Sequence, residues 1–72
     1  MKPEEQKLKE KISEALVQQF PGNIPTIIDI SAETFRYQLE RNDNYAYYLI
    51  EYSIDPSGNL KVDWKKAEQF ML

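Results

Sequence analysis

The sequence contains no cysteine and no histidine. Without cysteine the chain has neither a disulfide nor a thiolate nucleophile. Without histidine it lacks the commonest metal ligand and the usual acid–base group near neutral pH, and no histidine can activate a serine. These absences argue against catalysis, and we expect a non-enzymatic protein with no metal and no cofactor.

Glycine is almost as scarce, because Gly22 and Gly58 are the only two and each falls in a stretch typical of a turn. The chain therefore has no glycine-rich loop for phosphate, and we expect no small-molecule substrate. No run of about 18 apolar residues is present, which predicts no membrane span. The lack of cysteine fits a reducing compartment and the charged N-terminal stretch has no apolar signal core, so we expect a cytoplasmic protein.

The remaining composition is that of one small folded domain covering residues 1–72. Hydrophobic residues make up 42% of the chain and the net charge is only −3, which argues against disorder. A chain of this length buries a small core, so each core side chain should matter and self-association would add buried area. The charge is uneven: residues 21–59 carry a net charge of −4, which disfavours a nucleic-acid backbone on that segment.

Residues 3–20 have the pattern of an amphipathic helix. Pro3 suits the first helical position, and Leu8, Ile12, Leu16 and Phe20 recur every four residues. The stretch FPGN at 20–23 predicts the end of this helix, because proline cannot continue it and glycine accepts a left-handed turn.

From Pro25 the apolar spacing changes to the two-residue period of a strand. Apolar residues occupy even positions in the first half of 26–40 and odd positions in the second half: Ile28, Ile30 and Ala32, then Phe35, Tyr37 and Leu39. This change of phase near residues 31–34 predicts either a bulge in one strand or a break between two short strands, and we favour the bulge.

Two turn sequences divide the rest of the chain. RNDN at 41–44 precedes a second strand over 45–54, and DPSGN at 55–59 precedes a third strand, LKVDW, at 60–64. Residues 65–72 are expected to form a short helical turn or a tail whose Phe70 and Leu72 can dock. The predicted fold is α+β: one N-terminal amphipathic helix packed on a three-stranded antiparallel meander.

The predicted core joins the apolar side of the helix to one face of the sheet. Its members are Leu8, Ile12, Leu16, Phe20, Phe35, Tyr37, Leu39, Tyr48, Ile50, Tyr52, Ile54, Leu60, Val62 and Trp64. Tyrosine hydroxyls in this set should reach the edge of the core, where they find hydrogen-bond partners.

The second strand places large side chains on its other face as well, where one helix cannot cover them. Tyr45, Tyr47 and Leu49 share that face, with Arg36 and Glu51 as part of a charged rim at its border. Tyrosine is enriched in protein interfaces, so these five residues predict a surface that binds a protein partner, which can be a second copy in a homodimer. Ile28 or Ile30 would join it if the bulge lies elsewhere, whereas a C-terminal FML folded over the face would leave no binding surface.

Two other functions stay open at this point. Glu40 and Glu51 could form a carboxylate pair for acid–base work if they meet across the sheet. The order of elements is similar to that of double-stranded-RNA-binding domains, which implies contacts from basic residues; the last segment is too short for their second helix. A nucleic-acid-associated accessory protein would use Lys61, Lys65 and Lys66. We favour a small regulator, inhibitor or immunity-type factor.

Overall fold

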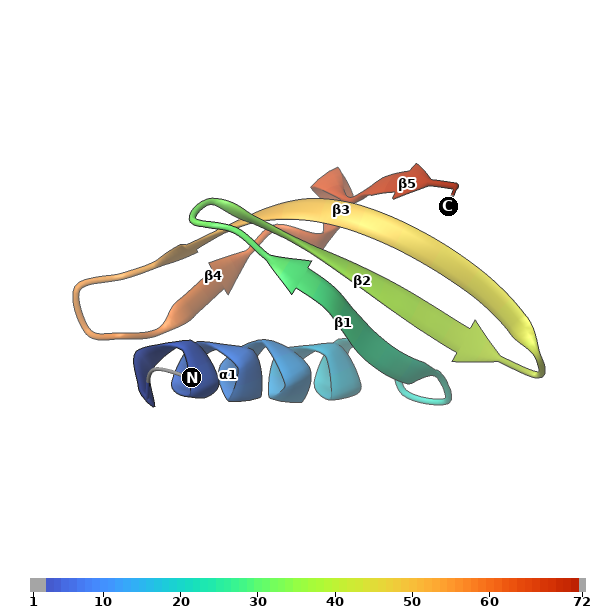
Figure 1. Cartoon of the computed structure of the whole chain (residues 1–72), viewed down its shortest axis with the longest axis horizontal. Coiled ribbons are helices and arrows are strands. Elements are labelled where there is room, and N and C mark those ends of the chain that lie inside the picture. The colour runs from blue at the N-terminus through green and yellow to red at the C-terminus, as the bar shows by residue number, and fades with distance from the viewer. Residues whose placement is uncertain (1–2, 72) are drawn as a thin grey trace.

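The computed structural model describes residues 3–71 and has one helix against an antiparallel sheet. In chain order the elements are α1 (Pro3–Gln19), β1 (Ile24–Ile30), β2 (Thr34–Arg41), β3 (Asn44–Ile54), β4 (Leu60–Val62), the 3₁₀ turn η1 (Trp64–Lys66) and β5 (Glu68–Phe70). Figure 1 shows α1 lying along one face of the curved sheet. The α+β fold with an N-terminal helix is confirmed, but the sheet has five strands where three were expected.

The helix is held by the apolar stripe seen in the sequence. Ile12 and Leu16 are fully buried, and Leu8 and Phe20 pack beside them at either end of the stripe. The predicted stop is also confirmed, because Gly22 has a φ of 87°, which a residue without Cβ adopts without strain. The chain then turns back into β1, so α1 and β1 lie in contact.

The preference for a bulge at residues 31–34 was wrong, and the alternative of two short strands holds. Ser31 N–H donates to the Thr34 carbonyl over 2.8 Å, and this turn joins β1 to β2 as a hairpin. A bulge does exist, but it lies earlier, where the register shifts between Ile27 and Asp29. Because of this shift Ile27 and Ile30 both pack against the core, three residues apart.

The turn predicted at 41–44 joins β2 to β3. Asn42 and Asp43 have φ values of 51° and 64°, as expected for a two-residue hairpin whose twist matches that of its strands. β3 is the longest strand and pairs with β2 from Arg41↔Asn44 to Thr34↔Glu51. Its other edge pairs first with β5 and then with β4.

Asp55 organises the turn between β3 and β4. Its Oδ1 accepts hydrogen bonds from the backbone N–H groups of Asn59, over 2.8 Å, and Ser57, over 2.9 Å. These bonds, that of Asn59 above all, hold the pKa of the Asp55 carboxyl below its usual range. Lys11 of α1 donates to the Gly58 carbonyl, so the helix also contacts this turn.

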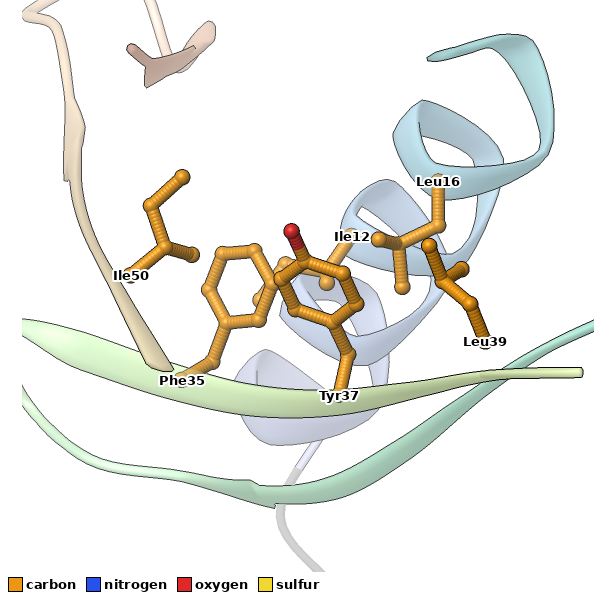
Figure 2. Close-up of a cluster of buried hydrophobic side chains, with 6 residues drawn as sticks. All are labelled: Ile12, Leu16, Phe35, Tyr37, Leu39 and Ile50. Carbon is orange, nitrogen blue, oxygen red and sulfur yellow. The ribbon is translucent and has the colours of Figure 1, made fainter. Parts of the chain in front are cut away.

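The core lies between α1 and the sheet face that we call the inner face (Figure 2). Its buried members are Ile12, Leu16, Phe35, Tyr37, Leu39 and Ile50. Tyr48 and Tyr52 pack against them as predicted, and the Tyr52 hydroxyl donates to the Ser31 carbonyl over 2.6 Å. Ile54 was wrongly placed in the core: it is 43% exposed, because it lies where β3 pairs with the short β4 beyond the reach of β2.

Aromatic contacts fill the centre of the core. The Tyr37 and Tyr48 rings stack with centroids 5.3 Å apart, and the Trp64 ring meets Phe20 edge to face at 5.4 Å. Burial, followed by the charge of a neighbouring Tyr48, raises the pKa of Tyr37 to about 12. The contacts of Trp64 place η1 against the edge of the inner face. The expected C-terminal helical turn is therefore packed on the core through Trp64.

Candidate protein-binding face

The register of the strands defines a second, outer face, opposite α1. Directly paired residues share a face, so one row across the sheet reads Asp29, Arg36, Leu49 and Glu68. The next row reads Thr26, Gln38, Tyr47 and Phe70, and a third reads Ile24, Glu40 and Tyr45. Within residues 3–71 the only α-helix lies on the inner face, which leaves these three rows without a helix over them.

All five residues predicted for partner binding lie on this outer face. Tyr45, Tyr47, Leu49 and Glu51 alternate along β3, and Arg36 on β2 is paired with Leu49. The two-residue alternation of side chains along a strand therefore predicted their placement correctly. Their role in binding stays a prediction, because the fold alone assigns no partner.

We define the aromatic strip as Tyr45, Tyr47, Leu49 and Phe70. Tyr45 is 53% exposed, and Tyr47, Leu49 and Phe70 are partly exposed. The Tyr47 and Phe70 rings lie 6.0 Å apart on β3 and β5. Sequence reasoning expected Phe70 to dock as part of a tail, but not to join this surface. Glu68 and Gln69 are both polar, so the three residues of β5 show no strand-like alternation, and three residues are too few to recognise a strand.

The C-terminal segment does not fold over the tyrosines. It adds β5 to the edge of β3 through the pairs Tyr47↔Phe70 and Leu49↔Glu68, and so extends the outer face. Met71 is 89% exposed, and Leu72 lies outside the described residues. The alternative in which FML covers the face is therefore wrong for residues up to 71.

Arg36 was expected at the border of the outer face, but it lies within that face, between Asp29 and Leu49. Its Nε donates to Asp29 Oδ1 over 2.9 Å and its Nη2 to Oδ2, a two-point pair between β2 and β1. The hydrogen bonds from Arg36 lower the pKa of Asp29, and those same bonds raise the pKa of Arg36. On its other side the guanidinium carbon lies 5.7 Å from the centroid of the Phe70 ring.

The bulge at Ile28 positions the Asp29–Arg36 pair. One extra residue in β1 shifts the register, so that Asp29 faces Arg36 across the hairpin. Ile28 itself lines a groove beside Leu8 and Lys9 of α1, and Ile30 pairs with Phe35 on the inner face. The expectation that Ile28 or Ile30 would join the tyrosines was therefore wrong.

A carboxylate pair for acid–base work does not form. Glu40 is paired with Tyr45 and Glu51 with Thr34, which places them near opposite ends of the β2–β3 ladder. Six residues of extended strand separate the two levels by about 20 Å, too far for one substrate atom to meet both carboxylates. In the described part of the chain, no three acidic side chains cluster closely enough to hold a metal ion.

The three lysines proposed for nucleic acid are exposed but do not share one element. Lys61 is on β4 with its Nζ 3.9 Å from Asp55 Oδ2, whereas Lys65 and Lys66 are in η1. Asp63 caps η1 by accepting from the Lys65 backbone N–H over 3.2 Å, so an acidic group lies beside η1 as well as beside Lys61. Binding of nucleic acid by these lysines stays a prediction.

Comparison of the chain with protein-family models, curated proteins and solved structures finds no match in any of the three. Among the described residues, α1 is neither long enough nor apolar enough to cross a membrane.

Proposed function

We propose that this chain is a non-enzymatic cytoplasmic interaction protein, a small regulator, inhibitor or immunity-type factor, that binds another protein through the outer face of its sheet. The observation that supports this most directly is the aromatic strip. Tyr45, Tyr47, Leu49 and Phe70 lie together on a sheet face that has no helix over it within residues 3–71.

The strip has the composition expected at the centre of an interface. Tyrosine and phenylalanine offer large rigid contact areas, and tyrosine keeps a polar tip for a hydrogen bond. Arg36, already fixed by Asp29 and beside the Phe70 ring, adds the third residue type that interface centres favour. Because Arg36 is held before binding, less side-chain entropy is lost when a partner covers it.

The tyrosines of the inner and outer faces differ in whether packing within the chain accounts for them. Inner-face packing accounts for Tyr37, Tyr48 and Tyr52, each of which contacts the core. It does not account for Tyr45 and Tyr47, since a sheet face left to water is normally polar. A partner that covers the strip would provide the missing burial.

Affinity capture from the native organism, followed by mass spectrometry, tests this proposal. Tyr47→Glu places a charge in the strip, and Val17→Glu is a matched control because Val17 is 59% exposed on α1. We expect a protein enriched by the wild type and by Val17→Glu to be lost with Tyr47→Glu. Identical captures by all three forms would contradict the proposal.

Two further measurements separate the remaining alternatives. Light scattering of the wild type and Tyr47→Glu detects a second copy on the outer face, which would give a dimer only in the wild type. Titration with duplex and single-stranded oligonucleotides detects the nucleic-acid alternative through binding that weakens as salt is raised.

A further inference from the structure

The charges of the outer face are not balanced. Arg36 is paired with Asp29, and Lys61, beyond the strip on β4, is paired with Asp55. Glu40, Glu51 and Glu68 take part in neither of these two ion pairs, which are the only ones among the side chains described, those of residues 5–71. The charge that the outer face offers to a partner is therefore negative.

These three glutamates adjoin the aromatic strip on several sides. Glu40 on β2 is directly paired with Tyr45, and Glu68 on β5 is directly paired with Leu49. Glu51 is two residues beyond Leu49 on the same strand, and so on the same face. Glu51 and Glu68 are exposed, and Glu40 is partly exposed. An apolar strip with an acidic border is the result.

We propose that the occupant of this face is a basic amphipathic helix of a partner protein, whose apolar side chains cover the strip and whose lysines or arginines reach Glu40, Glu51 and Glu68. This inference rests on the proposed function and specifies the chemistry of the partner. A helix is the form that already covers the inner face, and two covered faces complete a three-layer arrangement. Charged groups at the border of an interface select the partner by complementarity.

A second copy of the chain fits this face poorly. In a two-fold symmetric dimer the same patch meets itself, so the glutamate border of one subunit would approach that of the other. Arg36 could offset this only by leaving Asp29, which would then lose both hydrogen bonds of its pair. Like charges brought together at an interface oppose association.

Two synthetic peptides of about 18 residues, a length that forms a helix of several turns, test the inference. Both carry the same leucine stripe and a fluorescent label; one has lysine and arginine beside the stripe, and the other has glutamate. Fluorescence anisotropy at two salt concentrations measures their binding to the folded chain. We expect the basic peptide to bind about tenfold more tightly, with a preference that shrinks as salt rises.

A charge-matched pair of variants locates the effect. The triple variant Glu40→Gln, Glu51→Gln, Glu68→Gln should remove most of the preference for the basic peptide. The control Glu5→Gln, Glu10→Gln, Glu14→Gln changes the net charge equally, but on exposed positions of α1, and should leave the preference within about threefold of the wild type.

Each other outcome overturns the inference in a recognisable way. Equal binding of both peptides that is lost in Tyr47→Glu would mean that the strip binds helices without regard to charge, so the proposed function would stand and the basic partner would not. Absence of binding by either peptide, an equal loss in both triple variants, or a dimer that Tyr47→Glu dissociates would each rule out the basic helix. The proposed function itself would be contradicted only by the affinity capture, if the wild type, Val17→Glu and Tyr47→Glu gave identical captures.

Discussion

The two faces of the sheet are built from the same strands, yet within residues 3–71 only the inner face has a helix over it. On the inner face Phe35 and Tyr37 are at most 1% exposed beneath α1. On the outer face Tyr45, one strand away, is 53% exposed. Aromatic content therefore does not distinguish a core from a binding surface; what distinguishes them is which side of the strand faces the helix.

The largest expected contrast is in stability. Phe35→Ala should lower the free energy of unfolding by about 3–5 kcal/mol, because it removes a fully buried ring from a packed centre. Tyr45→Ala, the same kind of truncation on the outer face, should cost about 1 kcal/mol or less. Urea unfolding followed by circular dichroism measures both.

This contrast is large relative to the stability of such a small domain. A domain of this size has only several kcal/mol in total, so Phe35→Ala is expected to keep little of its stability and to unfold at a much lower urea concentration than the wild type. Equal losses for the two truncations would mean that the outer face is as buried as the inner one, and would remove the basis for a docking surface there.

A second effect of the inner face appears at high pH, because burial raises the pKa of Tyr37 to about 12. The unfolded chain loses this proton near pH 10, so the stability that depends on neutral Tyr37 is present below pH 10 and lost as pH rises toward 12. Two pKa units correspond to roughly 2.7 kcal/mol as an upper limit. Urea unfolding between about pH 9 and pH 12 measures the loss.

Tyr37→Phe is the control, because it keeps the buried ring and removes the proton. Its unfolding free energy should fall less steeply with pH than that of the wild type, since the Tyr37 proton no longer contributes. Parallel curves for the two proteins would show that Tyr37 titrates as freely as an exposed tyrosine.

The smallest expected effect belongs to the outer-face ion pair. Hydrogen bonds from Arg36 lower the pKa of Asp29, so this pair stabilises the fold above the usual aspartate pKa and stops doing so as pH falls through the lowered value. Asp29→Asn should therefore flatten the loss of stability below about pH 4, by less than the change at Tyr37, because both partners are exposed to water. An acid titration that leaves wild type and Asp29→Asn with the same slope would contradict this.

Periodicity in the sequence was enough to predict α1 and the face of each β3 residue. The four-residue spacing from Leu8 to Phe20 has few interpretations other than a helix. The two-residue apolar spacing in β3 is unbroken from Ala46 to Ile54, so Tyr48 could be assigned inward and Tyr47 outward without knowing the partner strands.

The apolar period did not predict the features of the sheet that depend on short segments. Residues 31–33 change the phase of the apolar pattern, but a bulge and a tight hairpin change it equally, and only pairing over the length of β2 separates them. β5 has three residues, and it is stable as a strand because β3 offers an unpaired edge beside it. Asp29 was likewise missed as part of the outer face, because its position depends on the bulge at Ile28.

The position of β5 also decides how the molecule can be oriented on a support. β5 ends at Phe70, within the aromatic strip, whereas α1 begins on the other side of the sheet (Figure 1). A linker or reporter attached close behind β5 would crowd the surface that a partner must reach. Tethering through the helical end would instead leave that surface facing the solution.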